Sequence, residues 1–409
     1  MRNSQSNGRC FFVIESRNIG GHSGLTYGQI GGGPGSFIGP VHRAAIALNN
    51  QARIVSGCFS DVPEEVVETA RELGIDPSRA YSRYEEMAQK EALREDRMDF
   101  VVITAPNHIH YEVAKTFLEK DFHVVCEKPL SLDLEQAKTL LRLTKDHQRL
   151  FMVTYTYTGY PMVREARQLV RSGALGDIRV IVAEYAQDWL ADKAEDTGNR
   201  QAAWRTNPKY AGISCCVGDI GTHIENLVHF ITGLEIKQLS ARLETFVEGR
   251  VLDDNAFILL SYENGAAGSY WASQVAIGKE NGLKVRIYGT KGSIEWEQEN
   301  PNHLCLSLKG EPQSILRRGN AYLSDAAKSM TRLPSGHPEG YFEAFSNLYR
   351  NFCSALMRYK QTGTLEPLGE AEDFTNVMDG ASGIRFVEDC VKSSSQKGAW
   401  VYATTISEG

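Results

Sequence analysis

The chain lacks the cysteine patterns that are typical of disulfide-bonded small folds or of metal sites. Its 409 residues include eight cysteines, and none of them forms a Cys-x-x-Cys pair. Cys58 and Cys126 lie in apolar, strand-like runs, where a buried, reduced thiol is the usual state. We therefore expect neither a disulfide framework nor a bound metal.

Long hydrophobic runs and an excess of one charge are also absent. No apolar run approaches the roughly eighteen residues of a membrane span, and the run 10–14 is shorter than the core of a signal peptide. The net charge is −7, with acidic and basic residues interspersed, which argues against a nucleic-acid or anionic-membrane surface. We predict a cytoplasmic protein with a loosely held N-terminal extension over residues 1–23.

The length exceeds what one hydrophobic core usually supports, so two domains are expected. In the first, apolar runs alternate with helical patterns, which predicts a doubly wound parallel sheet. The predicted strands cover 25–30, 53–59, 99–104, 123–126 and 150–153, and the helices cover 41–48, 63–73, 110–119 and 133–145. We place this domain at 24–155 and a second domain at 156–409.

A glycine-rich turn follows the first predicted strand and precedes a helix. This context suits a dinucleotide-binding loop, because glycines let the backbone approach a pyrophosphate at a helix N-terminus. Gly31 and Gly33 fit the usual spacing, whereas the third glycine is either Gly39, after an insertion, or replaced by Ser36. The spacing alone does not distinguish a cofactor loop from an ordinary glycine-rich loop.

The residue that ends the second strand bears on the choice of cofactor. An acidic residue there would bind the ribose of NAD, and a nearby arginine would suit the phosphate of NADP. This chain has Ser60 followed by Asp61, with no basic residue next to them. The pattern favours NAD and leaves NADP possible.

The stretch Glu127-Lys128-Pro129 directly follows the predicted strand at 123–126. Ligands of open parallel sheets bind beyond the carboxyl ends of the strands, and proline restricts the backbone of the lysine before it. Lys128 is therefore a candidate catalytic residue. An ordinary turn with a solvated lysine is the alternative.

Asp219 and His223 are four residues apart at the start of a predicted helix, so they share one face. A carboxylate beside an imidazole is the pairing expected of a general base. Alternatively, Asp219 only caps the helix. A metal site that includes His229 is the weakest reading, because that residue lies on another face.

The rest of the second domain predicts an antiparallel sheet. Strands at 256–262 and 267–275, and at 284–288 and 293–296, flank short turns typical of hairpins. Residues 188–205 are interpreted as an irregular loop on the substrate side. Residues 300–336 are predicted to be the most loop-like region, followed by helices at 342–360 and 371–391.

These motifs, taken in order, resemble the Gfo/Idh/MocA family of sugar and cyclitol oxidoreductases from about residue 25 onward. The resemblance rests on Glu127-Lys128-Pro129, on Gly218-Asp219-x-x-x-His223, and on two segments similar to those of the family, Thr104-Ala105-Pro106-Asn107 and Trp204-Arg205. The enlarged glycine loop and Ser60 depart from the family pattern. The implied fold is a Rossmann domain followed by an α/β domain whose large, open, mostly antiparallel sheet often mediates oligomers.

The resemblance implies hydride transfer between a carbinol carbon and a nicotinamide cofactor, NAD or NADP. His223 would be the base, Lys128 would stabilise the developing alkoxide, and Asp219 would orient and tune His223. The implied substrate residues are Tyr155, Trp204, Arg205 and His223. The implied cofactor residues are Gly31, Gly33, Ser36, Phe37, Ile38, Ser60, Pro106, Asn107, His110, Glu127 and Lys128. We expect a homo-oligomer, either a dimer or a tetramer.

Two other functions fit the same motifs. In a redox-assisted glycoside hydrolase or lyase, NAD would oxidise the sugar transiently and be restored after elimination. A non-catalytic dinucleotide-binding regulator would keep the fold without turnover, although a sensor does not need Lys128, Asp219 and His223 together.

Overall fold

The computed structural model of the chain describes residues 24–365, 369 and 372–406. The predicted extension at 1–23, Cys10 and the predicted helix start at Ala371 lie outside the described residues. Two sheets organise the molecule, one of five strands and one of nine. No helix in the described residues is long and apolar enough to cross a membrane.

The five-stranded sheet is parallel throughout, in the order β2-β1-β3-β4-β5. This confirms the predicted Rossmann sheet. Its strands are β1 (Leu25–Gly31), β2 (Ala52–Cys58), β3 (Phe100–Thr104), β4 (His123–Cys126) and β5 (Phe151–Val153). Its helices are α1 (Ile38–Asn49), α2 (Pro63–Glu72), α3 (Tyr84–Ala92), α4 (His110–Leu118) and α5 (Leu134–Asp146).

The direction of the strand order reverses at β1, with β2 on one side and β3 on the other. In such sheets the ligand crevice lies beyond the carboxyl ends of the strands at this point. Every residue of β3 and β4 is buried, which explains why their sequences are apolar on both faces. The chain therefore leaves β3 and β4 directly beside the crevice.

The nine-stranded sheet has the order β13-β12-β11-β10-β6-β9-β8-β7-β14 and is antiparallel except for the β6–β9 pair. Both predicted hairpins, β8–β9 and β10–β11, are present. The strands are β6 (Ile178–Ala186), β7 (Ile236–Glu244), β8 (Asn255–Tyr262), β9 (Ala267–Ser273), β10 (Gly282–Gly289), β11 (Gly292–Glu297), β12 (His303–Leu308), β13 (Ser314–Arg317) and β14 (Val401–Tyr402).

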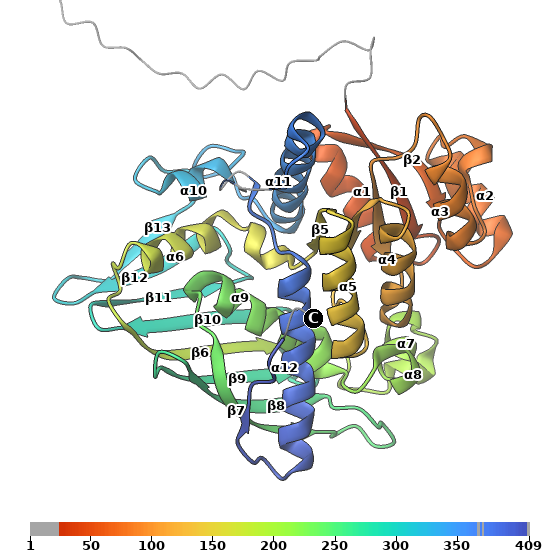
Figure 1. Cartoon of the computed structure of the whole chain (residues 1–409). Coiled ribbons are helices and arrows are strands. Elements are labelled where there is room, and N and C mark those ends of the chain that lie inside the picture. Colours follow the sequence, from red (N-terminus) through yellow and green to blue (C-terminus); the bar gives the residue numbers. More distant parts are fainter. Residues whose placement is uncertain (1–23, 366–368, 370–371, 407–409) are drawn as a thin grey trace, which may run out of the picture.

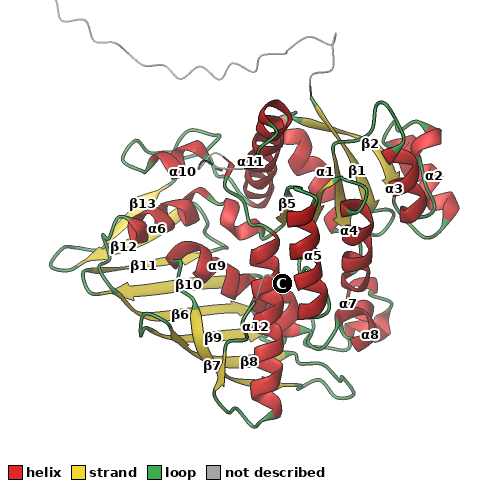
Figure 2. Cartoon of the chain, in the orientation of Figure 1, coloured by secondary structure: helices red, strands yellow, loops and turns green. Residues whose placement is uncertain are grey.

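Among the residues that the structure describes, the helices that pack on this large sheet lie on one of its faces. Figure 2 shows α6 (Pro161–Arg171), α9 (Thr222–Thr232) and α12 (Val377–Ser395) on that side, and their apolar side chains share a core with the strands. The alternating burial along β8 shows that the opposite face is open. Phe257 and Leu259 on β8 are each more than half exposed.

Two predicted loop regions contain regular structure. Residues 300–336 include β12, β13 and α10 (Asp325–Ser329), and 188–205 include the 3-10 helix η4 (Ala194–Thr197) and α7 (Arg200–Arg205). The short helix α8 (Pro208–Ala211) follows α7. These elements were missed because each is too short to show a hydrophobic period, and because β12 and β13 depend on pairing with β11.

A helix from the C-terminal part of the chain packs on the five-stranded sheet and on α1. In Figure 1, α11 (Tyr341–Thr362) lies against α1 although about three hundred residues separate them. Phe345 and Phe352 of α11 share a core with Val41 and Phe100. The N-terminal sheet is thus covered on one side by a segment from the end of the chain.

Candidate active site

The glycine-rich turn between β1 and α1 forms a cradle of bare backbone. Gly31 and Gly32 have φ values of 74° and 79°, which side chains rarely adopt. A Cβ on Gly39 would lie 2.3 Å from the Cα of Gly32, and one on Gly33 would lie 2.8 Å from the carbonyl oxygen of Phe59. Gly39 therefore provides the close packing expected of a third glycine.

Ser36 has a different function from Gly39. Its Oγ accepts a hydrogen bond from the Gly39 N–H at 3.2 Å, within the first turn of α1. Phe37 is 67% exposed at the same helix start, and Ile38 is the first residue of α1. The cradle and the helix N-terminus together suit a pyrophosphate.

Arg200 of α7 reaches this loop from the second domain. Its Nη1 lies 3.3 Å from the position that a Cβ on Gly35 would occupy. No sequence pattern indicated this placement, since Arg200 lies in a segment predicted as irregular loop. The guanidinium adds positive charge next to the cradle.

Acidic side chains surround the end of β2. Ser60 Oγ donates a hydrogen bond to Glu65 Oε2 at 2.6 Å and accepts one from the Val62 N–H at 3.2 Å. Asp61 Oδ1 lies 3.5 Å from the same hydroxyl. Negative charge at this point opposes a ribose phosphate and allows a free ribose hydroxyl.

A buried histidine, His110, fixes the turn after β4 by contacting the backbone carbonyl of Pro129. His110 Nδ1 lies 2.8 Å from the carbonyl oxygen of Pro129, and its Nε2 lies 2.8 Å from that of Ala105. The Lys128–Pro129 peptide bond is cis. Pro106 and the buried Asn107 begin the 3-10 turn η2 (Asn107–Ile109) just before His110. His110 thus joins the ends of β3 and β4.

Glu127 is the centre of a buried polar network beneath Lys128. Its Oε1 lies 2.9 Å from His42 Nε2 and accepts a hydrogen bond from Thr154 Oγ1 at 2.6 Å, while its Oε2 accepts from the Lys128 N–H at 3.2 Å. Burial opposes its ionisation, but His42, Lys128 and Thr154 together outweigh that effect and lower the pKa of Glu127 to about 2. Glu127 is therefore a fixed anion.

Lys128 is anchored on Asp219, which lies 91 residues away in the sequence. Its Nζ donates to the Asp219 carbonyl oxygen at 2.8 Å and to Oδ1 at 2.9 Å. Arg205 Nε and Gln274 Nε2 donate to Oδ2 at 3.2 and 3.0 Å. Burial raises the pKa of Asp219, but Lys128 and Arg205 outweigh it and hold that pKa well below its ordinary range.

His223 is the second residue of the α-helix that follows Asp219, α9 (Thr222–Thr232). Asp219 lies in the π-helical turn η5 (Val217–Gly221), and His223 lies in α9. No hydrogen bond joins the two side chains among the described residues, and the carboxylate oxygens of Asp219 accept from Lys128, Arg205 and Gln274 instead. The predicted influence of Asp219 on His223 thus acts through charge, which raises the pKa of the imidazole.

Aromatic rings surround His223. The ring centroids of Tyr157, Tyr155 and Tyr185 lie 4.8, 5.7 and 6.1 Å from that of the imidazole. Within the described part of the chain, His223 Nδ1 is buried without a hydrogen-bond partner. Burial and the nearby charge of Lys128 hold the pKa of His223 well below its ordinary value. The imidazole is therefore neutral at neutral pH and able to accept a proton.

The predicted substrate residues lie on two sides of this centre. Arg205 contacts Asp219 and stacks on Trp204, with 4.1 Å between guanidinium and ring centroid. Tyr155 is buried against His223. The structure thus brings Lys128, Asp219 and Arg205 together, with His223 beside them.

A polar network that the sequence did not predict lies on the far side of His223. The Tyr157 and Tyr185 hydroxyls lie 2.5 Å apart, and Tyr185 OH donates to Asn281 Oδ1 at 2.6 Å. Gln187 Nε2 donates to the same amide oxygen at 2.9 Å. These residues come from η3 (Thr156–Gly159), β6 and the loops at 187 and 281, so only the fold brings them together.

A Rossmann sheet with a glycine cradle, and a lysine fixed at the crevice beside a neutral histidine, define a nicotinamide-dependent oxidoreductase. Residues 25–155 match the family described as an oxidoreductase family with an NAD-binding Rossmann fold, and residues 163–295 match the GFO/IDH/MocA C-terminal domain. The chain belongs to the Gfo/Idh/MocA family.

Relatives match almost the whole chain. An uncharacterised oxidoreductase of Bacillus subtilis, YfiI, is 34% identical, with 92% of this chain and 96% of the relative covered. Levoglucosan dehydrogenase of Pseudarthrobacter phenanthrenivorans is 28% identical, covering 94% and 99%. The crystal structure of an inositol dehydrogenase homologue from Azotobacter vinelandii with NAD+ is 37% identical, with a TM-score of 0.88 and coverage of 93% and 97%.

Proposed function

We propose that the protein oxidises a secondary hydroxyl of a sugar, sugar derivative or cyclitol and transfers the hydride to NAD. The observation that carries the proposal is the hydrogen-bonded Lys128–Asp219 pair beside a neutral His223, at the mouth of a dinucleotide crevice. Relatives named as sugar or inositol dehydrogenases, and solved structures with NADH and myo-inositol or levoglucosan, support the substrate class.

NAD would supply the carbon that accepts the hydride. Residues at the glycine turn and the end of β2 would hold its pyrophosphate and ribose, and residues at the ends of β3 and β4 would face its nicotinamide half. The first group comprises Gly31, Gly33, Ser36, Phe37, Ile38 and Ser60, and the second comprises Pro106, Asn107, Glu127 and Lys128. His110 would act by positioning the turn, because carbonyl oxygens lie next to both of its ring nitrogens.

The catalytic step needs a base and a cation. As the carbinol carbon loses hydride, its hydroxyl proton passes to a ring nitrogen of His223, and a C=O bond forms. Lys128 stabilises the negative charge that develops on the oxygen. Asp219 fixes the ammonium group and moderates the loss of basicity that Lys128 causes in His223. Tyr155, Trp204 and Arg205 would line the substrate side.

NAD is proposed over NADP because Glu65 and Asp61 surround the hydroxyl of Ser60. Replacing Glu65 by arginine is expected to raise kcat/KM with NADP and to lower it with NAD, measured by NADH or NADPH absorbance. As a matched control, Glu68→Arg adds the same charge on the exposed side of α2 and should leave the cofactor ratio unchanged. An unaltered ratio in Glu65→Arg would contradict this cofactor assignment.

We propose a cytoplasmic homo-oligomer that associates through the open sheet. The sheet patch, defined as Val180, Phe257, Leu259, Trp271 and Tyr288, is apolar and partly exposed, and Phe257 stacks on Trp271 with centroids 6.3 Å apart. Such a patch is typical of subunit interfaces. The seven described cysteines are free, which fits a reducing compartment. Light scattering of Leu259→Glu should show smaller particles than the native chain.

A screen of sugars and cyclitols against NAD and NADP tests the function. Accumulation of NADH with a stoichiometric amount of ketone or lactone product supports the dehydrogenase. A changed sugar product without net NADH would instead show transient, redox-assisted chemistry. Tight NAD binding with no turnover of any compound would overturn the proposal in favour of a regulator.

A further inference from the structure

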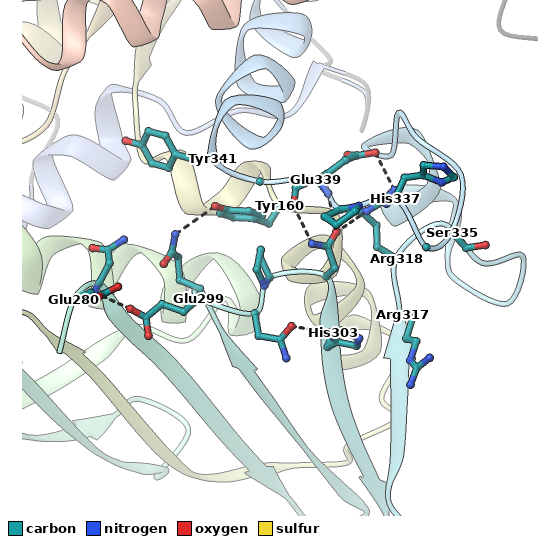
Figure 3. Close-up of a pocket in the computed structure, with 18 of the residues that line it drawn as sticks. Tyr160, Glu280, Glu299, His303, Arg317, Arg318, Ser335, His337, Glu339 and Tyr341 are labelled. Atoms are coloured by element: carbon teal, nitrogen blue, oxygen red, sulfur yellow. Dashed lines mark hydrogen bonds and ion pairs between the residues drawn. The ribbon is translucent and has the colours of Figure 1, made fainter. Parts of the chain in front are cut away.

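A cavity of about 1280 Å³, with both polar and apolar lining, opens beside Tyr160, which stacks on Tyr157 next to His223. Figure 3 shows Tyr160 and Tyr341 on one side of it and residues of the sheet edge on the other. Its walls come from the loops around 280 and 300, from the end of β13 and from residues 335–341. The loop around 280 also contributes Asn281 to the polar network beside His223.

Tyr157 forms the boundary between the catalytic centre and this cavity. One side of its ring is directed to His223, 4.8 Å between centroids, and it stacks on Tyr160 with centroids 6.4 Å apart. Asn281 Nδ2 donates to its hydroxyl at 3.4 Å. Because Tyr160 and Asn281 both line the cavity, the ring of Tyr157 lies between the cavity wall and His223.

The lining chemistry suits a neutral, hydroxyl-rich ligand. Lys279 and Arg317 are balanced by Glu280 and Glu299, so the exposed charges do not favour an anion or a cation. Gln298 Nε2 donates to Tyr160 OH at 3.5 Å, which places an amide beside an aromatic ring. Amides and carboxylates can hydrogen-bond to the hydroxyls of such a ligand, and an aromatic ring offers a face for its apolar side.

The cavity wall is fixed by a buried ion pair. Arg318 donates to Glu339 Oε1 at 2.8 Å and to Asn302 Oδ1 at 2.6 Å, and the side chains of both partners of the pair are 2% exposed. Arg318 also donates to the carbonyl oxygen of Leu333 at 2.7 Å. The segment 333–339 is thereby tied to the sheet edge, so the cavity has a defined shape.

We propose that this cavity binds the second ring of a glycoside, so that the preferred substrates are disaccharides or other glycosides whose first ring is oxidised at His223. The inference rests on the proposed function. A volume of about 1280 Å³ exceeds the roughly 300–1,000 Å³ of sites for single small ligands. Tyr160 in its lining stacks on Tyr157, whose ring in turn contacts His223.

The test compares kcat/KM for the best monosaccharide of the screen with that for its disaccharides and its phenyl glycoside. The expected disaccharide-to-monosaccharide ratio is about tenfold or more in the native protein, a gain of about 1.4 kcal/mol in transition-state binding. Two variants, Gln298→Ala in the wall and His337→Trp to fill the space, should each lower that ratio by about fivefold or more.

Lys309→Ala serves as the control, because Lys309 is exposed on the turn after β12 and does not line the cavity. It should leave the ratio unchanged. A native ratio near or below one, or a ratio that neither variant alters, overturns the inference while monosaccharide oxidation still stands. A change in oligomeric state of His337→Trp without a change in the ratio also overturns it, since a second copy would then occupy the cavity. Loss of turnover of every sugar would instead reject the proposed function.

Discussion

Lys128 and His223 belong to the same site, but their surroundings are opposite. The lysine ammonium donates two hydrogen bonds to Asp219, whereas His223 is enclosed by tyrosine rings and its Nδ1 has no partner among the described residues. The first arrangement fixes a charge in place. The second disfavours the charged form of a group whose proposed role is to accept and release a proton. Burial alone therefore does not determine what a titratable side chain does, since the polar partners that it retains decide its protonation state.

Among the site variants, removal of the His223 imidazole should lower activity most. We expect His223→Ala to lower kcat by roughly 10²–10⁴-fold, the usual contribution of a positioned base. NAD binding, measured by the quenching of protein fluorescence, should change little. Simultaneous loss of turnover and NAD binding would contradict the assignment of His223 as the base.

Removing the fixed charge should have the next largest effect. Lys128→Met keeps the length of the side chain but loses the stabilisation of the alkoxide, and kcat should fall by roughly 10²–10³-fold. KM for the sugar should change less than kcat, because the interaction strengthens in the transition state. A variant that changes only KM would show that Lys128 binds the ground state.

The pH dependence of kcat/KM tests whether His223 is the base. A base must be deprotonated to act, and the pKa of His223 is lowered first by burial and then by Lys128, while Asp219 and Glu127 raise it. The acid limb of kcat/KM for alcohol oxidation should therefore lie below pH 6.5, the ordinary pKa of histidine. Asp219→Asn removes a negative charge and should shift that limb to still lower pH. A shift to higher pH would show that the limb reports another group.

The smallest effect on activity is expected at Tyr157, one of the tyrosines whose rings surround His223. Tyr157→Phe keeps the ring contact with His223 but removes the hydroxyl that joins Tyr185 and Asn281. The free energy of unfolding should fall by about 1 kcal/mol, measured by urea denaturation, with kcat reduced only a few-fold. A loss of kcat comparable to that of His223→Ala would instead indicate that the hydroxyl takes part in proton transfer.

The sequence predicted the parts of the site that lie at strand ends. The buried run before Lys128 and the glycine turn before α1 are local patterns, and the structure confirms the strand, the turn and the helix that they imply. The catalytic roles of Lys128, Asp219 and His223 stay predictions. Gln274, Asn281 and Arg200 could not be predicted, because pairing within the large sheet and the path of α7 place them at the site. Local sequence patterns also could not predict the hydrogen bonds that Asp219 accepts from Lys128, Arg205 and Gln274. The helical spacing indicated His223 as its neighbour instead.

The packing of α11 on the first domain has a consequence for synthesis of the chain. Val41 and Phe100 are translated early, yet Phe345 and Phe352, which cover them, are translated some 240 residues or more later. A nascent chain released at residue 155 would leave this apolar face in water. We therefore expect that residues 24–155 do not fold when they are expressed alone. Ribosome-bound intermediates of this protein are expected to need a chaperone until α11 has emerged.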